Sequence, residues 1–226
     1  MVEEPRLVCA GDPIDAAGLL LADAVGAVDR ARGATRLAIP GGSALAALGA
    51  TRRRLGDAWS RVLLTWVDER CVPLAHEESN RGAAYRAGYL AAQRGPAREL
   101  PLFLDGERGE EAAARVESGL GEIFEGAVDV LLLGMGEDGH VASLFPGWSA
   151  PPGARVAFVA SSPKPPAHRV TLTRSMLVTA RCTILVAAGE AKRAALDRLL
   201  AGDPTLPAPG LPGLTVVTDL DPKELT

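Results

Sequence analysis

The sequence has few cysteines and no long apolar run, and each absence excludes a class of protein. Its three cysteines, Cys9, Cys71 and Cys182, lie far apart and form no C-x-x-C pair. We therefore expect neither a disulfide framework nor a cysteine zinc site. No apolar run approaches the roughly 18 residues of a membrane-spanning helix. The N-terminus, MVEEPRLVCAGDPID, is acidic and lacks the apolar core of a signal peptide, so we expect a cytoplasmic protein with reduced thiols.

The sequence also lacks a surplus of basic residues. Its formal net charge is −4, which disfavours nonspecific binding to nucleic acid or to a membrane surface. A few local cations could still bind a small anion within an acidic protein. With 226 residues, the chain suits one large α/β domain over residues 1–226 and is short for two.

Apolar runs with strand character recur along the chain, and helical patterns lie between them. The run Val-Asp-Val-Leu-Leu-Leu at 128–133 is nearly continuous, which is typical of parallel strands buried on both faces. Asp12 followed by Pro13 indicates the start of a helix. Further strands are expected at Leu7–Cys9, Arg36–Ile39, Val62–Val67, Val156–Ala160, Arg169–Leu172, Thr183–Ala187 and Leu214–Thr218. The alternation predicts an α/β fold: an open, mostly parallel twisted sheet with helices on both faces, a Rossmann-like three-layer α/β/α arrangement.

Ligands of such sheets bind beyond the carboxyl ends of the strands. Four of the predicted strands are followed by loops whose residues could bind a ligand or take part in catalysis. The first loop holds Gly41, Gly42 and Ser43 before an Ala/Leu-rich helix. Two glycines allow a ligand to approach the backbone, and the N–H groups at a helix start attract a phosphate. A plain tight turn with a serine cap is the alternative.

Two further loops carry cations. Asp68, Glu69 and Arg70 directly follow an apolar strand, so Arg70 could pair with a phosphate while a carboxylate orients a hydroxyl or moves a proton. Lys164 stands among the prolines of Ser-Pro-Lys-Pro-Pro, where a rigidly held ammonium suits an anionic ligand. The alternatives are a solvated charge cluster for the first loop and a surface lysine in a proline-rich turn for the second.

The most informative loop, GMGEDGHVASLFPG at 134–147, follows the most hydrophobic strand. Its glycines match the dinucleotide-binding pattern G-x-G-x-x-G. However, Pro146-Gly147 interrupts the helix that this pattern must open, and the acidic residue expected about 20 positions later is missing. Asp138 and His140 instead indicate an acid/base pair, because imidazole titrates near neutral pH and a carboxylate can fix its tautomer. A purely structural histidine is the alternative.

Four blocks of the sequence together resemble one family. They are IPGGSALAAL, WVDERCVPLAHEESNRGAAY, LLLGMGEDGHVASLFPG and SPKPPAHRVTLT, in this order. They closely resemble 6-phosphogluconolactonases, within the superfamily of glucosamine/galactosamine-6-phosphate isomerases, from about Leu7 to Thr218. Two departures stand out: Ala44-Leu45 replace a common Thr-Pro, and Val141 replaces a common threonine.

The resemblance implies hydrolysis of 6-phospho-D-glucono-1,5-lactone to 6-phosphogluconate, the second step of the oxidative pentose phosphate pathway. It implies no metal and no organic cofactor. It also implies a sugar-phosphate lactone as the partner, with no nucleic acid or membrane partner, in a monomer or weak homodimer. The implied catalytic residues are His140, Asp138 and Asp68. The implied phosphate-binding residues are Gly41, Gly42, Ser43, Arg70, Lys164 and Arg169.

Two other functions remain as alternatives. Hexosamine-6-phosphate deaminases resemble the pattern DGHIAFNEP, with a glutamate five positions after the histidine, where this chain has Phe145. A sugar-phosphate sensor would keep the phosphate cradle and lose the proton-transfer residues, yet Asp68, Asp138 and His140 are all present. A seryl nucleophile is disfavoured because no G-x-S-x-G motif occurs.

Overall fold

The structure, a computed structural model, describes residues 4–90 and 95–221. The strands are β1 (Arg6–Cys9), β2 (Thr35–Ile39), β3 (Val62–Trp66), β4 (Asp68–Arg70), β5 (Arg98–Leu100), β6 (Val130–Gly134), β7 (Val156–Val159), β8 (Arg169–Leu172), β9 (Cys182–Val186) and β10 (Leu214–Thr218). The helices are α1 (Pro13–Arg32), η1 (Ser43–Ala47), α2 (Leu48–Leu55), η2 (Gly56–Arg61), α3 (Asn80–Arg86), α4 (Gly109–Phe124), α5 (Arg174–Leu177), η4 (Glu190–Lys192) and α6 (Arg193–Leu200).

The predicted domain over residues 1–226 includes residues 1–3, 91–94 and 222–226, which lie outside the described residues. One domain over the whole chain therefore stays a prediction. Within the described residues, the helices are too short or too polar to cross a bilayer.

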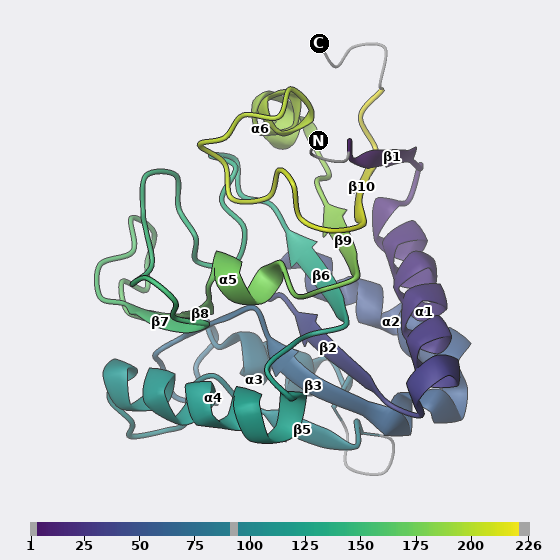
Figure 1. The fold of residues 1–226 in the computed structure, drawn as a ribbon. Helices are drawn as coiled ribbons and strands as arrows, with labels where there is room; N and C mark the ends of the chain where they lie inside the picture. Colours follow the sequence, from purple (N-terminus) through teal and green to yellow (C-terminus); the bar gives the residue numbers. More distant parts are fainter. Residues whose placement is uncertain (1–3, 91–94, 222–226) are drawn as a thin grey trace.

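A seven-stranded sheet forms the centre of the fold. Its strand order is β1-β10-β9-β6-β2-β3-β5, and every described pairing in it is parallel. Figure 1 shows α1 and α2 on one side of this sheet and α4 on the other. The predicted open, mostly parallel sheet with helices on both faces is therefore confirmed.

Local sequence signals explain where these elements begin and why they are buried. The side chain of Asp12 accepts a hydrogen bond of 2.9 Å from the backbone N–H of Asp15, and Pro13 occupies the first turn of α1. Leu21 and Val25 on α1 are fully buried. The residues 130–133 of β6 have no exposed surface, as the continuous apolar run predicts.

The strand order reverses between β2 and β6. From β2 the chain builds outward through β3 and β5, whereas from β6 it builds through β9 and β10 in the opposite direction. The connections after β2 and β6 consequently diverge and leave a crevice at the carboxyl edge of the sheet. The Gly41–Ser43 loop and the 134–147 loop both begin at this crevice.

A second, three-stranded antiparallel sheet has the order β4-β8-β7. The runs predicted at Val156–Ala160 and Arg169–Leu172 form β7 and β8 of this sheet. The Lys164 loop therefore follows a predicted strand and connects β7 to β8, but these strands belong to the antiparallel sheet and not to the parallel one. Pairing of Arg70 with Arg169 brings the Lys164 loop back to the crevice.

Candidate active site

A cavity of about 310 Å³ opens at the crevice between β2 and β6. Every predicted site residue except Asp138 lines it. The side chains and backbone that form its wall belong to Gly41, Gly42, Ser43, Asp68, Arg70, Asn80, Gly136, His140, Lys164, Arg169 and Lys192, among others. The fold therefore brings together residues that are up to about 150 positions apart in the sequence.

His140 and Asp138 form a close pair at one side of the cavity. Nδ1 of His140 lies 2.5 Å from Oδ1 of Asp138, and Nζ of Lys164 lies 3.3 Å from the same oxygen. Burial alone would raise the pKa of Asp138, but the hydrogen bond to His140 and the nearby Lys164 lower it to about 2. Asp138 is therefore ionised at neutral pH, and an ionised carboxylate only accepts hydrogen bonds.

The pairing fixes the tautomer of His140. Because Asp138 can only accept a hydrogen bond, Nδ1 of His140 carries the ring proton. The lone pair of Nε2 is then available to accept a second proton. Burial lowers the pKa of His140 below the ordinary 6.5, and Asp138 only partly offsets this effect. The ring of Phe145 contributes to the burial, since its centroid lies 4.6 Å from that of the imidazole. The site thus presents a neutral, oriented base.

The titration of His140 is a first prediction. Because burial disfavours the imidazolium, we expect His140 to titrate with a midpoint below 6.5. The measurement is the imidazole C2–H chemical shift by NMR between about pH 4.5 and 8, with the signal assigned by its disappearance in His140→Ala. A midpoint above 6.5 would show that Asp138 outweighs burial.

Gly136 packs against the imidazole of His140 and the carboxylate of Asp138. A Cβ at position 136 would lie 2.1 Å from Nδ1 of His140 and 2.5 Å from Oδ1 of Asp138, too close for any atom. We expect Gly136→Ala to displace the imidazole and lower kcat about tenfold or more while the chain stays folded. Gly121→Ala on α4 is the matched control, because a Cβ there meets only one atom, at 4.0 Å. Equal kcat values in the two variants would refute this packing constraint.

Asp68 lies buried beneath the opposite wall. Its Oδ2 accepts a hydrogen bond of 2.6 Å from Oγ of Ser143, and its backbone oxygen accepts one of 2.9 Å from Nδ2 of Asn80. Both partners are themselves at most 3 % exposed. Asp68 is thus held rigidly at the cavity, as a catalytic or substrate-orienting carboxylate requires.

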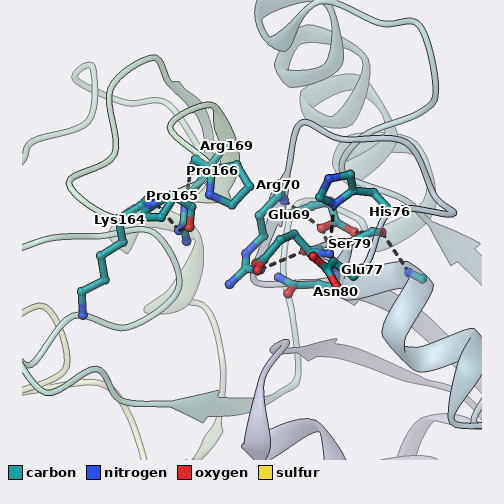
Figure 2. A network of polar contacts seen from close by, with 12 residues as sticks. Glu69, Arg70, His76, Glu77, Ser79, Asn80, Lys164, Pro165, Pro166 and Arg169 are labelled. Atoms are coloured by element: carbon teal, nitrogen blue, oxygen red, sulfur yellow. Dashed lines mark hydrogen bonds and ion pairs between the residues drawn. The ribbon is translucent and has the colours of Figure 1, made fainter.

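Glu69 anchors the loop that presents Arg70. Its carboxylate accepts hydrogen bonds from the backbone N–H groups of Arg70, Asn80 and Arg81, all between 2.7 and 2.8 Å. Burial raises the pKa of Glu69, and these three hydrogen bonds counteract the rise. Figure 2 shows Glu69 and Asn80 clustered beside Arg70, with Lys164 and Arg169 approaching from the other side.

Arg70 lines the cavity, and one nitrogen of its guanidinium is already bound to Glu78. Nη1 donates to the backbone oxygen and to Oε2 of Glu78, both at 2.8 Å. Its Nε is buried, and in the described part of the chain it has no hydrogen-bond partner. Nη2 is therefore the guanidinium nitrogen left to meet an anion in the cavity.

The glycine loop forms the floor of the cavity. Ser43 begins η1, which continues into α2, so it occupies the first turn of a helix as the sequence predicts, although that turn is a 3₁₀ turn. Gly41 is required because a Cβ there would lie 1.8 Å from Oδ1 of Asn80. The absence of a side chain at Gly41 thus lets the loop pack directly against Asn80 at the cavity wall.

Two polar side chains of the cavity, those of Lys192 and Asn80, were not predicted as site residues from the sequence. Lys192 follows β9, the fourth strand of the parallel sheet that ends at the crevice, and its ammonium contacts none of the described acidic groups. The sequence signal was the Gly-Glu-Ala-Lys segment after a buried strand. Asn80 follows Ser79 in the block WVDERCVPLAHEESNRGAAY, and no sequence pattern assigned it to the cavity rather than to the start of a helix.

Two backbone N–H groups of the 134–140 loop form hydrogen bonds within the loop itself. The N–H of Gly136 donates to the oxygen of His140 at 2.8 Å, and that of Gly139 donates to the oxygen of Gly136 at 3.0 Å. These two N–H groups are therefore occupied by hydrogen bonds within the loop. Among the described residues, no three His, Cys, Asp or Glu side chains gather in a way that could hold a metal ion.

A cation-lined cavity at the switch point of a doubly wound sheet, lined by a histidine that an aspartate orients, is typical of enzymes that act on small anionic substrates. A family model described as glucosamine-6-phosphate isomerases/6-phosphogluconolactonase matches residues 11–217. The chain therefore belongs to this family. That description covers both of the reactions weighed above, so membership does not choose between them.

Known relatives agree with this assignment. A 6-phosphogluconolactonase of Pseudomonas aeruginosa is 38% identical over 149 residues, which are 63% of this chain and 62% of that protein. The match therefore spans less than two thirds of that relative. A 6-phosphogluconolactonase of Caulobacter vibrioides is 33% identical over 204 residues, covering 87% of this chain and 86% of that protein. A crystal structure of a 6-phosphogluconolactonase from Shewanella baltica has a TM-score of 0.78 at 24% identity, covers 96% of this chain and 98% of that one, and so shows a shared fold.

Proposed function

We propose that this protein hydrolyses 6-phospho-D-glucono-1,5-lactone to 6-phosphogluconate, the second step of the oxidative pentose phosphate pathway. One observation carries the proposal: the oriented base His140 shares a single cavity with Arg70, Lys164 and Lys192. A neutral base suits water activation, and the cations suit a phosphorylated, anionic substrate. Two relatives that bear the name of this enzyme support the choice of substrate.

His140 acts on both halves of the reaction. Nε2 takes a proton from a water molecule as its oxygen attacks the lactone carbonyl carbon, and a tetrahedral oxyanion forms. The oxyanion then collapses, the bond from C1 to the ring oxygen breaks, and the imidazolium returns the proton to the ring oxygen. Asp138 stabilises the imidazolium between these steps.

The cations hold the substrate at two places. The guanidinium of Arg70 and the start of η1 bind the phosphate, with Lys192 as a further counter-charge. Lys164 binds the phosphate in the same cavity. Its ammonium also lies 3.3 Å from Asp138, so its positive charge acts on the oxyanion at the reacting end.

Arg70→Ala tests the phosphate assignment. We expect KM to rise roughly 10- to 100-fold with little change in kcat, because the lost hydrogen bonds to a charged group act on substrate and transition state alike. Steady-state kinetics measure both constants. Arg54→Ala, on the exposed face of α2, serves as the control. A flat KM would mean that other cations hold the phosphate.

Phe145 disfavours the deaminase alternative. This position is the fifth after His140, where the deaminase pattern carries a glutamate, and the Phe145 ring is 5% exposed and packed on the imidazole. A phenyl ring cannot move protons during amine release. The test compares acid release from the lactone in a pH-stat with ammonia release from glucosamine 6-phosphate. Ammonia release with no lactone hydrolysis would overturn the proposal.

A further inference from the structure

Arg169 lines the cavity, yet its guanidinium is almost entirely enclosed by protein. The residue is only 3 % exposed. It sits at the start of β8, directly opposite Arg70 on β4. A phosphate ligand must keep N–H groups turned toward the substrate, so the partners of these groups decide whether Arg169 can be one.

One end of the guanidinium closes the turn that carries Lys164. Nε donates to the oxygen of Pro166 at 3.1 Å, while Nη2 donates to the oxygens of Lys164 and Pro165 at 3.1 and 3.0 Å. Figure 2 shows Arg169 beside Pro165 and Pro166, with the Lys164 side chain extending away from them. Prolines supply no N–H groups to hold such a turn, so the arginine provides the donors that the turn lacks.

The other end reaches the catalytic groups. Nη1 lies 3.4 Å from Oγ of Ser143, which donates to Asp68, and 3.7 Å from Oδ2 of Asp68 itself. The guanidinium carbon lies 5.7 Å from the centroid of the Phe145 ring, and the same ring packs on His140. Arg169 therefore contacts the Lys164 turn, Asp68 and the neighbour of His140 at once.

A donor inventory leaves little for a substrate. A guanidinium has five N–H groups. The hydrogen bonds to Pro166, Lys164, Pro165 and Ser143 use four of them. The fifth, on Nη1, belongs to the nitrogen nearest to Asp68.

We propose that Arg169 is a positioning residue and not a phosphate ligand: it holds the Lys164 turn at a fixed place relative to Asp68 and His140. The proposal rests on the proposed function, because it concerns the same cavity. It replaces the phosphate-binding role that the family resemblance implied for this residue.

Substitution by lysine separates the two roles. Lysine keeps the positive charge but cannot donate to three carbonyl oxygens and a hydroxyl in a planar arrangement. If Arg169 binds the phosphate, the lysine in Arg169→Lys should largely restore that contact. If Arg169 positions the turn, lysine should not restore its role. We expect Arg169→Lys to weaken binding of 6-phosphogluconate about tenfold or more, and to lower kcat as well as raise KM.

A double-mutant cycle shows whether Arg169 acts through Lys164. The four proteins are wild type, Arg169→Lys, Lys164→Met and the double variant, and the measurement is the dissociation constant of 6-phosphogluconate by calorimetry. We expect the double variant to bind within about twofold of Lys164→Met, because the turn has nothing left to position. Losses that multiply, or full rescue by lysine, would show an independent phosphate contact and overturn the proposal.

Arg174→Lys is the matched control. Arg174 also donates to backbone oxygens of a proline-rich loop, those of Pro207 and Pro209, but lies outside the cavity. We expect it to change 6-phosphogluconate binding less than twofold. An equal loss in both variants would reveal a general loosening of the protein and contradict a specific role for Arg169.

A structure of the wild-type protein with bound 6-phosphogluconate decides the matter even if the Arg169 variants do not fold. We expect no nitrogen of Arg169 within 3.5 Å of a phosphate oxygen, and such a contact would overturn the proposal. A wild-type protein that neither binds 6-phosphogluconate nor hydrolyses the lactone would refute the proposed function instead.

Discussion

His140→Ala should lower kcat about 10²- to 10⁴-fold, the usual contribution of a positioned acid/base group. In the proposed mechanism, Nε2 of His140 carries both proton transfers, from water and to the ring oxygen. Because the proposal places the phosphate elsewhere, at Arg70 and the start of η1, the dissociation constant of 6-phosphogluconate should change less than about threefold. Steady-state kinetics and calorimetry measure the two quantities.

His168→Ala is the control for this variant. His168 is an exposed histidine near the Lys164 turn, and it packs against Phe158 rather than facing the cavity. We expect it to leave kcat within about twofold of wild type. A kcat for His140→Ala that matches the control would remove His140 from the mechanism.

Asp129→Asn should destabilise the fold by about 3–5 kcal/mol, the usual result of breaking a buried ion pair on one side. Asp129 is 2 % exposed and lies at the amino ends of β2 and β6, away from the cavity. Its carboxylate accepts hydrogen bonds from Nε and Nη2 of Arg36 at 3.0 and 2.8 Å. Arg36 is itself 7 % exposed, so the substitution leaves a buried guanidinium with only the exposed carboxylate of Glu125, 3.0 Å from Nη1, as a counter-charge.

The measurement is chemical or thermal unfolding, where this loss corresponds to a fall in Tm of roughly 6–20 °C for a chain of this size. Asp23→Asn, in the exposed pair with Arg54, is the control and should cost less than about 1 kcal/mol. Burial alone would raise the pKa of Asp129. The hydrogen bonds and charges of Arg36 and Arg32 together outweigh burial, so the pKa lies below 3.8. The contribution is therefore present above pH 4 and lost as the pH falls below this value. Equal unfolding midpoints in the two variants would contradict the account.

Most of the parallel sheet could be predicted because its signals are local, whereas the short edge strand β5 (Arg98–Leu100) was not among the predicted strands. The apolar run at 128–133 and the Asp12–Pro13 helix start each depend on a few adjacent residues, and both appear in the structure as expected. The antiparallel sheet could not be predicted in the same way. Strand β4 is the three charged residues Asp68–Arg70, which becomes a strand only because it pairs with β8, about 100 residues later. Pairing partners at that distance leave no trace in local periodicity.

The site was predictable as a set of residues but not as a set of roles. The loops after β2, β3 and β6 could be assigned to one edge, because parallel strands bring their carboxyl ends together. The three adjacent charges of Asp68, Glu69 and Arg70 look alike in sequence, yet Asp68 and Arg70 line the cavity while Glu69 binds backbone N–H groups. Arg169 likewise differs from Arg70 only through its partners. Such differences depend on burial and hydrogen bonding, which the sequence does not display.

The central claim is that one cavity uses His140 and its cations to hydrolyse a phosphorylated lactone. The most direct test follows 6-phosphogluconate formation with 6-phosphogluconate dehydrogenase, starting from fresh lactone and subtracting the spontaneous reaction. We predict saturable hydrolysis that is proportional to wild-type protein and falls to near background with His140→Ala. A wild-type rate equal to the spontaneous rate at every protein concentration would contradict the account.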